Sequence, residues 1–274
     1  ASDVVLTIAS SDTGEATVTS SLTFTSANWD TAQTVTVTGV DDGLIDGTIT
    51  STVTVSVNDG SSDNNFDAVS DQTVSVTTTD DDVAGFTIVE SSGSTSVDES
   101  GTTDTFTVVL DAQPTSDVVL SISSADTGEA TVTSLISFTS VNWDTAQTVT
   151  VTGVDDNLVD GAQTTSLSIV IVDVISDDTF DSVADQTVSV TTTDDDVAGF
   201  TIVESSGSTS VAESGTTDTF TVVLDAEPDS DVVLSVTSGD TGEATVTSSL
   251  TFTSANWDTA QTVTVTGADD DLVD

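Results

Sequence analysis

The sequence predicts an all-β chain of tandem β-sandwich domains, one for each 114-residue repeat, and three observations support this. The motif DVVL returns at a constant spacing of 114 residues, beginning at Asp3, Asp117 and Asp231. The patterned segments are rich in Val, Thr and Ile, which favour strands. No stretch of useful length has helical periodicity. A period this long has the size of a small sandwich rather than of one solenoid coil.

The strands of the middle period are expected where apolar residues alternate with Thr or Ser, the pattern of half-buried antiparallel strands. Clusters of Gly, Asp, Asn and Ser separate these segments and indicate turns. The expected strands are 86–90 (FTIVE), 96–100 (SVDES), 104–112 (DTFTVVLDA), 116–123 (SDVVLSIS), 129–134 (EATVTS), 135–140 (LISFTS), 146–153 (AQTVTVTG), 164–173 (TTSLSIVIVD) and 185–193 (DQTVSVTTT).

The core of this period is expected to contain Phe106, Phe138 and Trp143. The tryptophan also occurs in the other copies of NWDTAQTVTVTG, as Trp29 and Trp257. A carbohydrate-stacking role is the alternative for these tryptophans. Packing is favoured because each repeat has a single Trp with no aromatic neighbour in the sequence.

Domain edges are predicted at the repeated segment TTTDDDVAGF, near 82/83 and 196/197. Residues 83–196 then form a complete sandwich. Residues 1–82 form a partial repeat that lacks its first strands, and residues 197–274 form a partial repeat that lacks its last strands. We expect these residues to be a window on a longer polymer of the same repeat.

The chain carries 48 carboxylates and no Lys, Arg or His, which gives a net charge of -48. Such a chain repels nucleic acid and anionic membrane surfaces and attracts cations. It has no Cys, and no apolar run long enough to span a membrane. Without His, Lys or Cys it lacks the usual bases and nucleophiles, so we expect no enzyme. Paired carboxylates can hydrolyse glycosides, but here they lie at a domain junction rather than in a cleft. We expect a secreted, extracellular protein of the cell surface.

Three groups of carboxylates in the middle period are predicted to meet at one end of the sandwich, because alternate loops share an end. Like charges without a basic partner are best neutralised by Ca²⁺, which accepts six to eight oxygen ligands in irregular geometry, and about two or three ions per junction are expected. The alternative is that the three consecutive aspartates at 194–196 form a plain polar linker. The groups are Glu99; Asp155, Asp156 and Asp160; and Asp194, Asp195 and Asp196.

A further acidic motif, DTGEA, either joins this site or forms an ordinary turn, and the sequence favours neither. It occurs in each repeat, with Asp126 and Glu129 in the middle copy, Asp12 and Glu15 in the first, and Asp240 and Glu243 in the third.

The VxES turn, the VDD loop and the DDD triplet followed by AGF resemble the Calx-beta domain. That family includes calcium-sensing domains of sodium–calcium exchangers and tandem repeats of large bacterial surface proteins and adhesins. The resemblance covers the whole chain and implies a seven-stranded, immunoglobulin-like sandwich with Ca²⁺ at the tip that faces the next domain. It extends the implied metal ligands to Asp41, Asp42, Asp46, Asp80, Asp81, Asp82, Glu213, Asp269 and Asp270.

These features together predict the repetitive shaft of a giant secreted bacterial protein, a Ca²⁺-stiffened extracellular fibre or adhesin stalk. The alternative function is a calcium-sensing module whose interdomain geometry responds to Ca²⁺. The expected partners are neighbouring repeats of the same chain, and lateral self-assembly into filaments is a further possibility. Nucleic acid and membrane insertion are not expected.

Overall fold

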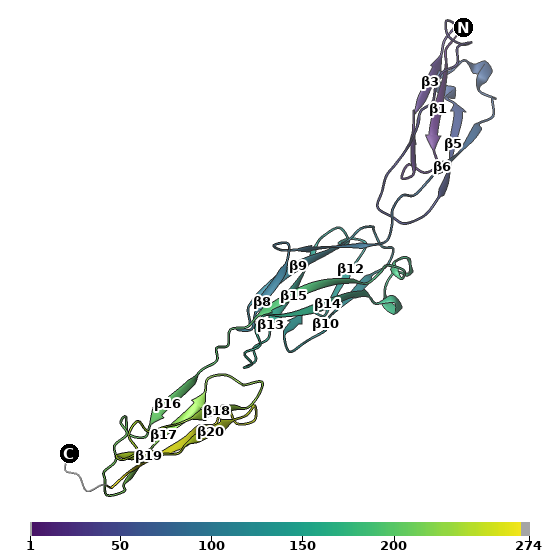
Figure 1. Ribbon diagram of the computed structural model, residues 1–274. Helices are drawn as coiled ribbons and strands as arrows, with labels where there is room; N and C mark the ends of the chain where they lie inside the picture. The colour runs from purple at the N-terminus through teal and green to yellow at the C-terminus, as the bar shows by residue number, and fades with distance from the viewer. Residues whose placement is uncertain (1, 270–274) are drawn as a thin grey trace.

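The computed structural model describes residues 2–269, and its strands fall into three consecutive groups that lie in an elongated row (Figure 1). We refer to them as the N-terminal unit (2–82), the middle unit (83–196) and the C-terminal unit (197–269). The N-terminal and C-terminal units lie at opposite ends of the row. The described elements are strands and single 3-10 turns, so the all-β prediction is confirmed. None of these turns has the length or apolar character needed to cross a membrane.

The middle unit is a sandwich of two sheets, with strand orders β12-β10-β14-β15-β8 and β11-β13-β9-β7. Every strand predicted for this repeat is present, with ends that differ by a few residues. The elements are β7 (Phe86–Glu90), β8 (Thr95–Asp98), β9 (Thr103–Leu110), β10 (Val118–Ser124), β11 (Ala130–Val132), β12 (Leu135–Phe138), β13 (Gln147–Gly153), β14 (Gln163–Ile171), η3 (Asp173–Ile175), η4 (Asp178–Phe180) and β15 (Gln186–Thr193).

One pairing in the middle unit departs from the antiparallel prediction. Strand β8 pairs parallel to β15, from Thr95 opposite Val190 to Asp98 opposite Thr193. The strands before and after β8 belong to the other sheet, so β8 crosses the sandwich and adds to a free edge. Because the two strands are parallel, they end at the same end of the unit.

The core of the middle unit lies between its sheets and follows the alternation seen in the sequence. Every second residue at the end of β9 is buried, and Phe106 and Phe138 are fully buried, as predicted. Phe180 of η4 closes one side. Trp143 packs against this core and is partly buried, which supports the packing interpretation. Its counterpart Trp29 is 71% exposed.

The N-terminal and C-terminal units each hold the counterpart of one sheet of the middle unit, together with a short second ladder. In the N-terminal unit the sheet is β3-β1-β5-β6 and the ladder β2-β4; in the C-terminal unit they are β16-β17-β21-β19 and β18-β20. Their elements are β1 (Val4–Ser10), β2 (Ala16–Val18), β3 (Ser21–Phe24), β4 (Val37–Gly39), β5 (Ile49–Val57), η1 (Asp59–Ser61), η2 (Asn64–Phe66), β6 (Gln72–Thr78), β16 (Phe200–Glu204), β17 (Thr217–Leu224), β18 (Val232–Ser235), β19 (Ala244–Val246), β20 (Ser249–Phe252) and β21 (Gln261–Gly267).

Candidate metal centre

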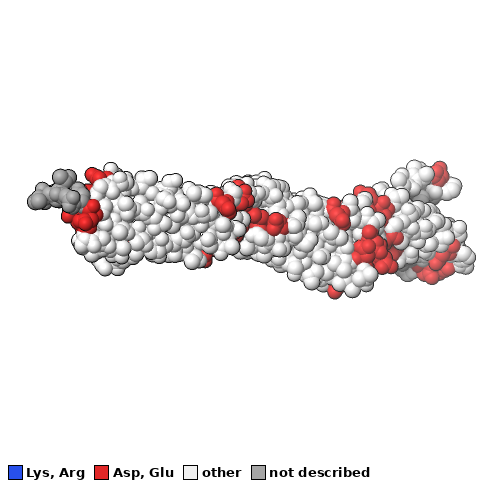
Figure 2. Space-filling view, turned by 60° about the horizontal axis from the view of Figure 1, so that its bottom comes forward, with Lys and Arg blue, Asp and Glu red and all other residues white. Residues whose placement is uncertain are grey.

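Acidic side chains gather in patches along the row, separated by uncharged surface, on the face that Figure 2 shows. One acidic cluster lies where β8 and β15 end together. Glu99 follows β8, and its N–H donates to the carbonyl oxygen of Thr193 at 3.1 Å, at the end of β15. Asp194 and Asp196 follow that strand directly. Carboxylate oxygens of Glu99, Asp194 and Asp196 lie within 4.8 Å of one another.

A second group of carboxylates comes from the ladder between β11 and β13. Because Ala130 pairs with Gly153, the residue before β11 lies beside the residue after β13, and Val154 N–H donates to the Glu129 carbonyl oxygen at 2.9 Å. The loop that carries Asp156 and Asp160 therefore starts next to Glu129. Burial, followed by the charges of Asp160, Asp126 and Asp156, raises the pKa of Glu129.

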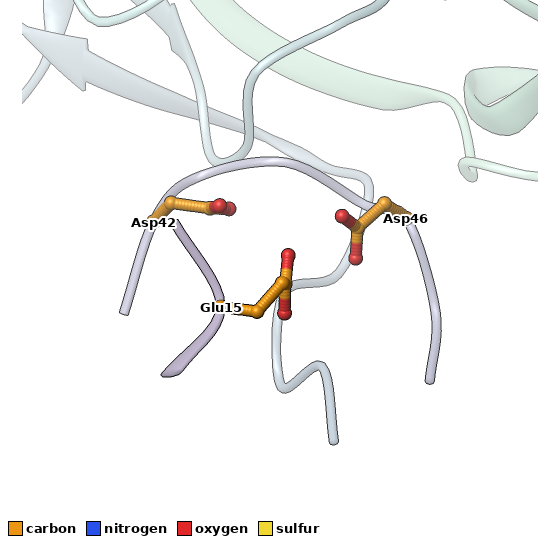
Figure 3. Close-up of side chains that lie close together, drawn as sticks. All are labelled: Glu15, Asp42 and Asp46. Atoms are coloured by element: carbon orange, nitrogen blue, oxygen red, sulfur yellow. The ribbon is translucent and has the colours of Figure 1, made fainter. Parts of the chain in front are cut away.

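The counterparts of Glu129, Asp156 and Asp160 in the N-terminal unit are Glu15, Asp42 and Asp46, and their carboxylate oxygens lie within 4.8 Å of one another. Figure 3 shows the Glu15 side chain reaching up between the other two carboxylates. The DTGEA glutamate of this unit therefore lies in the acidic cluster, while Asp12 of the same motif accepts from the Gly14 N–H at 3.0 Å, as in an ordinary turn. The first DDD triplet lies nearby, because a small cavity of about 30 Å³ is lined by Glu15, Asp42, Asp46, Asp80 and Asp82, among other residues.

Two aspartates in each cluster hold the loops in place. The Asp156 Oδ1 accepts from the Leu158 N–H at 2.7 Å. Asp194 accepts from the Gly161 N–H and from the Asp196 N–H, both at 2.8 Å, and thereby ties the loop to the exit of β15. The N-terminal unit repeats these bonds. There Asp42 accepts from the Leu44 N–H, and Asp80 accepts from the N–H groups of Gly47 and Asp82.

The electrostatic balance of the middle cluster is unfavourable as it stands. Glu99 is 1% exposed. Burial, followed by the negative charges of Asp156 and Asp194, raises its pKa to about 7. Burial and the neighbouring Asp194 likewise raise the pKa of Asp196. Buried oxygens of Glu99, Glu129 and Asp196 have no hydrogen-bond partner. Buried polar atoms are nearly always satisfied, so these three orphaned oxygens indicate a missing partner.

The donor set fits a hard divalent cation. All the side-chain donors in the cluster are carboxylate oxygens, and the chain has no His or Cys that Zn²⁺ or Cu²⁺ would prefer. Ca²⁺ binds six to eight oxygens in irregular geometry, whereas Mg²⁺ keeps most of its waters. The residues of the middle unit that would hold a Ca²⁺ ion are Glu99, Glu129, Asp156, Asp160, Asp194 and Asp196.

The remaining predicted ligands lie at the margin of the clusters or outside them. Asp155 and Asp195 are exposed, and their negative charges add to the effect of burial in raising the pKa of Asp196. Burial and the negative charges of neighbours that include Asp81 and Asp41 likewise raise the pKa of Asp82. In the C-terminal unit, Glu213 and Asp269 lie in no acidic group found among residues 2–269, and Asp270 lies outside the described residues.

The loop that carries Asp42 and Asp46 also contacts the next unit, which the sequence did not predict. The Gln113 N–H donates to the Gly43 carbonyl oxygen at 2.6 Å, and Leu44 forms a parallel bridge with Gln113. Ile45 packs against the core of the middle unit. A Cβ atom on Gly43 would lie 3.0 Å from the Trp143 ring, so glycine permits this close contact.

The second junction is built the same way. The Glu227 N–H donates to the Asn157 carbonyl oxygen at 2.7 Å, and Leu158 forms a parallel bridge with Glu227. The linker after each triplet is held as well. The Asp111 N–H donates to the Gly85 carbonyl oxygen at 2.9 Å, and a Cβ on Gly85 would collide with the Asp111 carboxylate.

No protein-family model and no curated protein matches the chain. Among similar solved structures is the S-layer protein SbsC, domains 4 and 5, with 21% identity and a TM-score of 0.33 over 69% of this chain and 70% of that chain. The apo form of the Calx CBD1 domain has 14% identity and a TM-score of 0.30, over 40% of this chain and 98% of that chain. CBD12 from CALX1.2 has 15% identity and a TM-score of 0.30, over 68% and 76%. Because these TM-scores are below 0.5, the assignment of a β-sandwich fold stands on the strand pairing of this chain itself.

Proposed function

We propose that this chain is a structural segment of an extracellular, cell-surface fibre or shaft, in which Ca²⁺ bound at each junction holds neighbouring units in line. The observation that carries the proposal is the double role of the loop at 40–47. Asp42 and Asp46 belong to the acidic cluster, while Gly43, Leu44 and Ile45 contact the next unit. A cation that fixes the aspartates therefore also fixes the residues between them.

The free energy available from such a site is large enough to matter. Binding to the ordered state alone stabilises it by RT ln(1 + [Ca²⁺]/Kd), which is about 2.7 kcal/mol per site when calcium exceeds Kd a hundredfold. Without the ion, the carboxylates repel one another, and this repulsion opposes the hydrogen bonds from the Leu44 and Gly47 N–H groups to Asp42 and Asp80 that hold the loop. The chain has no Cys for disulfides and no basic side chains for ion pairs, so metal is the cross-link that its composition allows.

Small-angle X-ray scattering in Ca²⁺ and in EGTA tests the proposal, at physiological ionic strength, where the Debye length is about 8 Å. We expect a straight rod in Ca²⁺, and a bent and broader ensemble in EGTA. Mg²⁺ should restore the rod poorly. Identical profiles and identical thermal unfolding in Ca²⁺ and EGTA would refute the proposal.

A matched pair of variants assigns the effect to the site. Asp156→Asn with Asp160→Asn should remove the calcium response of the second junction. Asp173→Asn with Asp185→Asn removes the same charge from exposed positions on the loop before β15, and this control should keep the response. Equal loss in both variants would indicate a general charge effect rather than a site.

A further inference from the structure

The outward face of one sheet in the middle unit is apolar where its counterpart in the N-terminal unit is polar. Ser121 of β10 pairs with Leu135 of β12 on one side and with Val170 of β14 on the other. Residues that pair directly across strands share a face, so these three side chains form one row on the surface of the sheet. The N-terminal unit has the same strand pairing, but its row consists of Thr7, Ser21 and Ser56.

The next row and the turn that follows it show the same difference. The Val172 N–H donates to the Val119 carbonyl oxygen at 2.9 Å, and both residues are partly exposed. The Ser176 hydroxyl accepts from the Val119 N–H at 3.0 Å and so holds the end of η3 beside this row. In η3 itself, Val174 is 91% exposed and Ile175 is 60% exposed. The N-terminal counterparts of Val172, Val174 and Ile175 are Asn58, Gly60 and Ser61.

This face combines exposed apolar side chains with uncharged strands. Leu135 is 59% exposed, so it contributes little to the core of its own unit. The strands β12, β10, β14 and β15 contain no acidic residue, and beside the apolar positions their outward side chains are Ser and Thr. The nearest acidic residues along the chain, Asp117 and Asp173, stand beyond the ends of β10 and β14. The four strands therefore present an uncharged face that carboxylates border.

We propose that this face pairs with the same face of a second copy, sheet against sheet, about a two-fold axis. The distribution of charge selects this occupant. A cationic partner would be drawn to the acidic patches, whereas two chains that each carry a net charge of -48 repel least where neither has carboxylates. The face also complements itself, because Leu, Val, Ser and Thr side chains are short and let two sheets pack about 10 Å apart.

The size of the face sets the strength of the contact. Four strands about 4.8 Å apart and about seven residues long cover roughly 450 Å² of flat area in each copy. Element η3 widens the face, and the accessible surface exceeds the flat area, so a pair would bury on the order of 1,200 Å² in total, the lower limit for specific complexes. The dimer should therefore be weak, and it should tighten as salt screens the charge of the two chains.

Sedimentation equilibrium in Ca²⁺ and about 1 M NaCl, where the Debye length is about 3 Å, tests the proposal. The parent chain should show a monomer of 27.7 kDa in equilibrium with a dimer of twice that mass. In a four-site variant, the dissociation constant of the dimer should be at least about tenfold higher. The N-terminal unit has the introduced residues at the same positions, so the sheet should still form, which urea unfolding verifies. The four substitutions are Leu135→Ser, Val170→Ser, Val174→Gly and Ile175→Ser.

Val89→Ser is the matched control, because Val89 is 57% exposed on β7 of the other sheet, and its loss should leave the dissociation constant unchanged. The four-site variant should keep the scattering response to Ca²⁺, so failure of this pairing is distinct from failure of the calcium proposal. The pairing is overturned if the parent is monomeric up to about 1 mM, if the four-site variant dimerises as tightly as the parent, or if Val89→Ser weakens the dimer equally. Growth beyond two copies would also overturn it, because a face that pairs with itself closes the assembly.

Discussion

Replacing Glu99 by Gln should change the stability of the middle unit in opposite directions with and without calcium. Burial raises the pKa of Glu99 from its ordinary value of 4.5 to about 7, so the folded chain holds a proton there more tightly than the unfolded chain does. The free energy of unfolding therefore falls as the pH rises from about 4.5 to about 7. One pKa unit is worth 1.36 kcal/mol, so at pH 8 the ionised group costs at most about 3 kcal/mol. Glutamine keeps the shape of the side chain without this cost.

In EGTA at pH 8 the Glu99→Gln variant should then be more stable than the parent, by about 1–3 kcal/mol once solvent screening is allowed for. Near pH 4.5, where Glu99 is protonated in the folded chain, the difference should vanish. In millimolar Ca²⁺ the order should reverse, because the variant has lost a charged ligand and gains less from the ion.

Urea unfolding followed by Trp143 fluorescence measures these differences. Trp29 and Trp257 are replaced by Phe in both chains, so that a single tryptophan reports on the middle unit. Asp173→Asn is the control, because it removes one exposed charge at the opposite end of β14 from Asp160 and should be nearly neutral under all conditions. A Glu99→Gln chain that is less stable than the parent in EGTA at pH 8 would show that the cluster is not under charge strain.

Three other substitutions test the fold and the junction. Asp177→Asn should cost about 2–5 kcal/mol in urea unfolding, because one buried carboxylate oxygen accepts from the N–H groups of Thr115 and Ser116 and from the Thr115 hydroxyl. Burial opposes ionisation of Asp177, but hydrogen bonds from Thr179 and Thr115 offset it and lower the pKa, so this stability should be lost as the pH falls below about 3.8. Gly153→Ala should cost about 1–3 kcal/mol, because the added Cβ would collide with the Asp98 carbonyl oxygen; an unchanged urea midpoint would contradict this packing. Ile45→Ser should broaden the scattering ensemble in Ca²⁺ while calorimetry still detects calcium binding, and loss of binding instead would place Ile45 in the metal site.

The strands could be predicted from the sequence because alternation is a local signal. The ends of β9 and β14 alternate between buried and less buried residues, and their letters follow this alternation except at Val109 and Val170, which are apolar but only partly buried. The parallel pairing of β8 with β15 was not predictable, since it joins residues about a hundred positions apart and leaves no local pattern. That pairing is what brings Glu99 beside Asp194. The same limit left Glu129 undecided, because a DTGE turn has the same letters whether or not a loop from β13 lies next to it.

The contact between units was missed for a different reason. Leu44 and Ile45 stand between two aspartates, and the whole segment reads as one acidic loop in the sequence. In the structure the carboxylates of this loop lie in the cluster, whereas the Ile45 side chain packs against the next unit. A period of one hundred or more residues shows that junctions recur, but it does not show which residues face across them.

Comparison of the two junctions shows which part of this contact tolerates change. Gly43 and Ile45 in the first junction are replaced by Asn157 and Val159 in the second, and Val159 is 46% exposed. The backbone bond survives both changes, at 2.6 Å to Gly43 and 2.7 Å to Asn157. A main-chain contact depends on where the loop lies rather than on which side chain it carries, and the aspartates determine where the loop lies. Alignment of the units can therefore persist when one apolar residue of the loop replaces another, as Val159 replaces Ile45, provided that the carboxylates keep the loop in place.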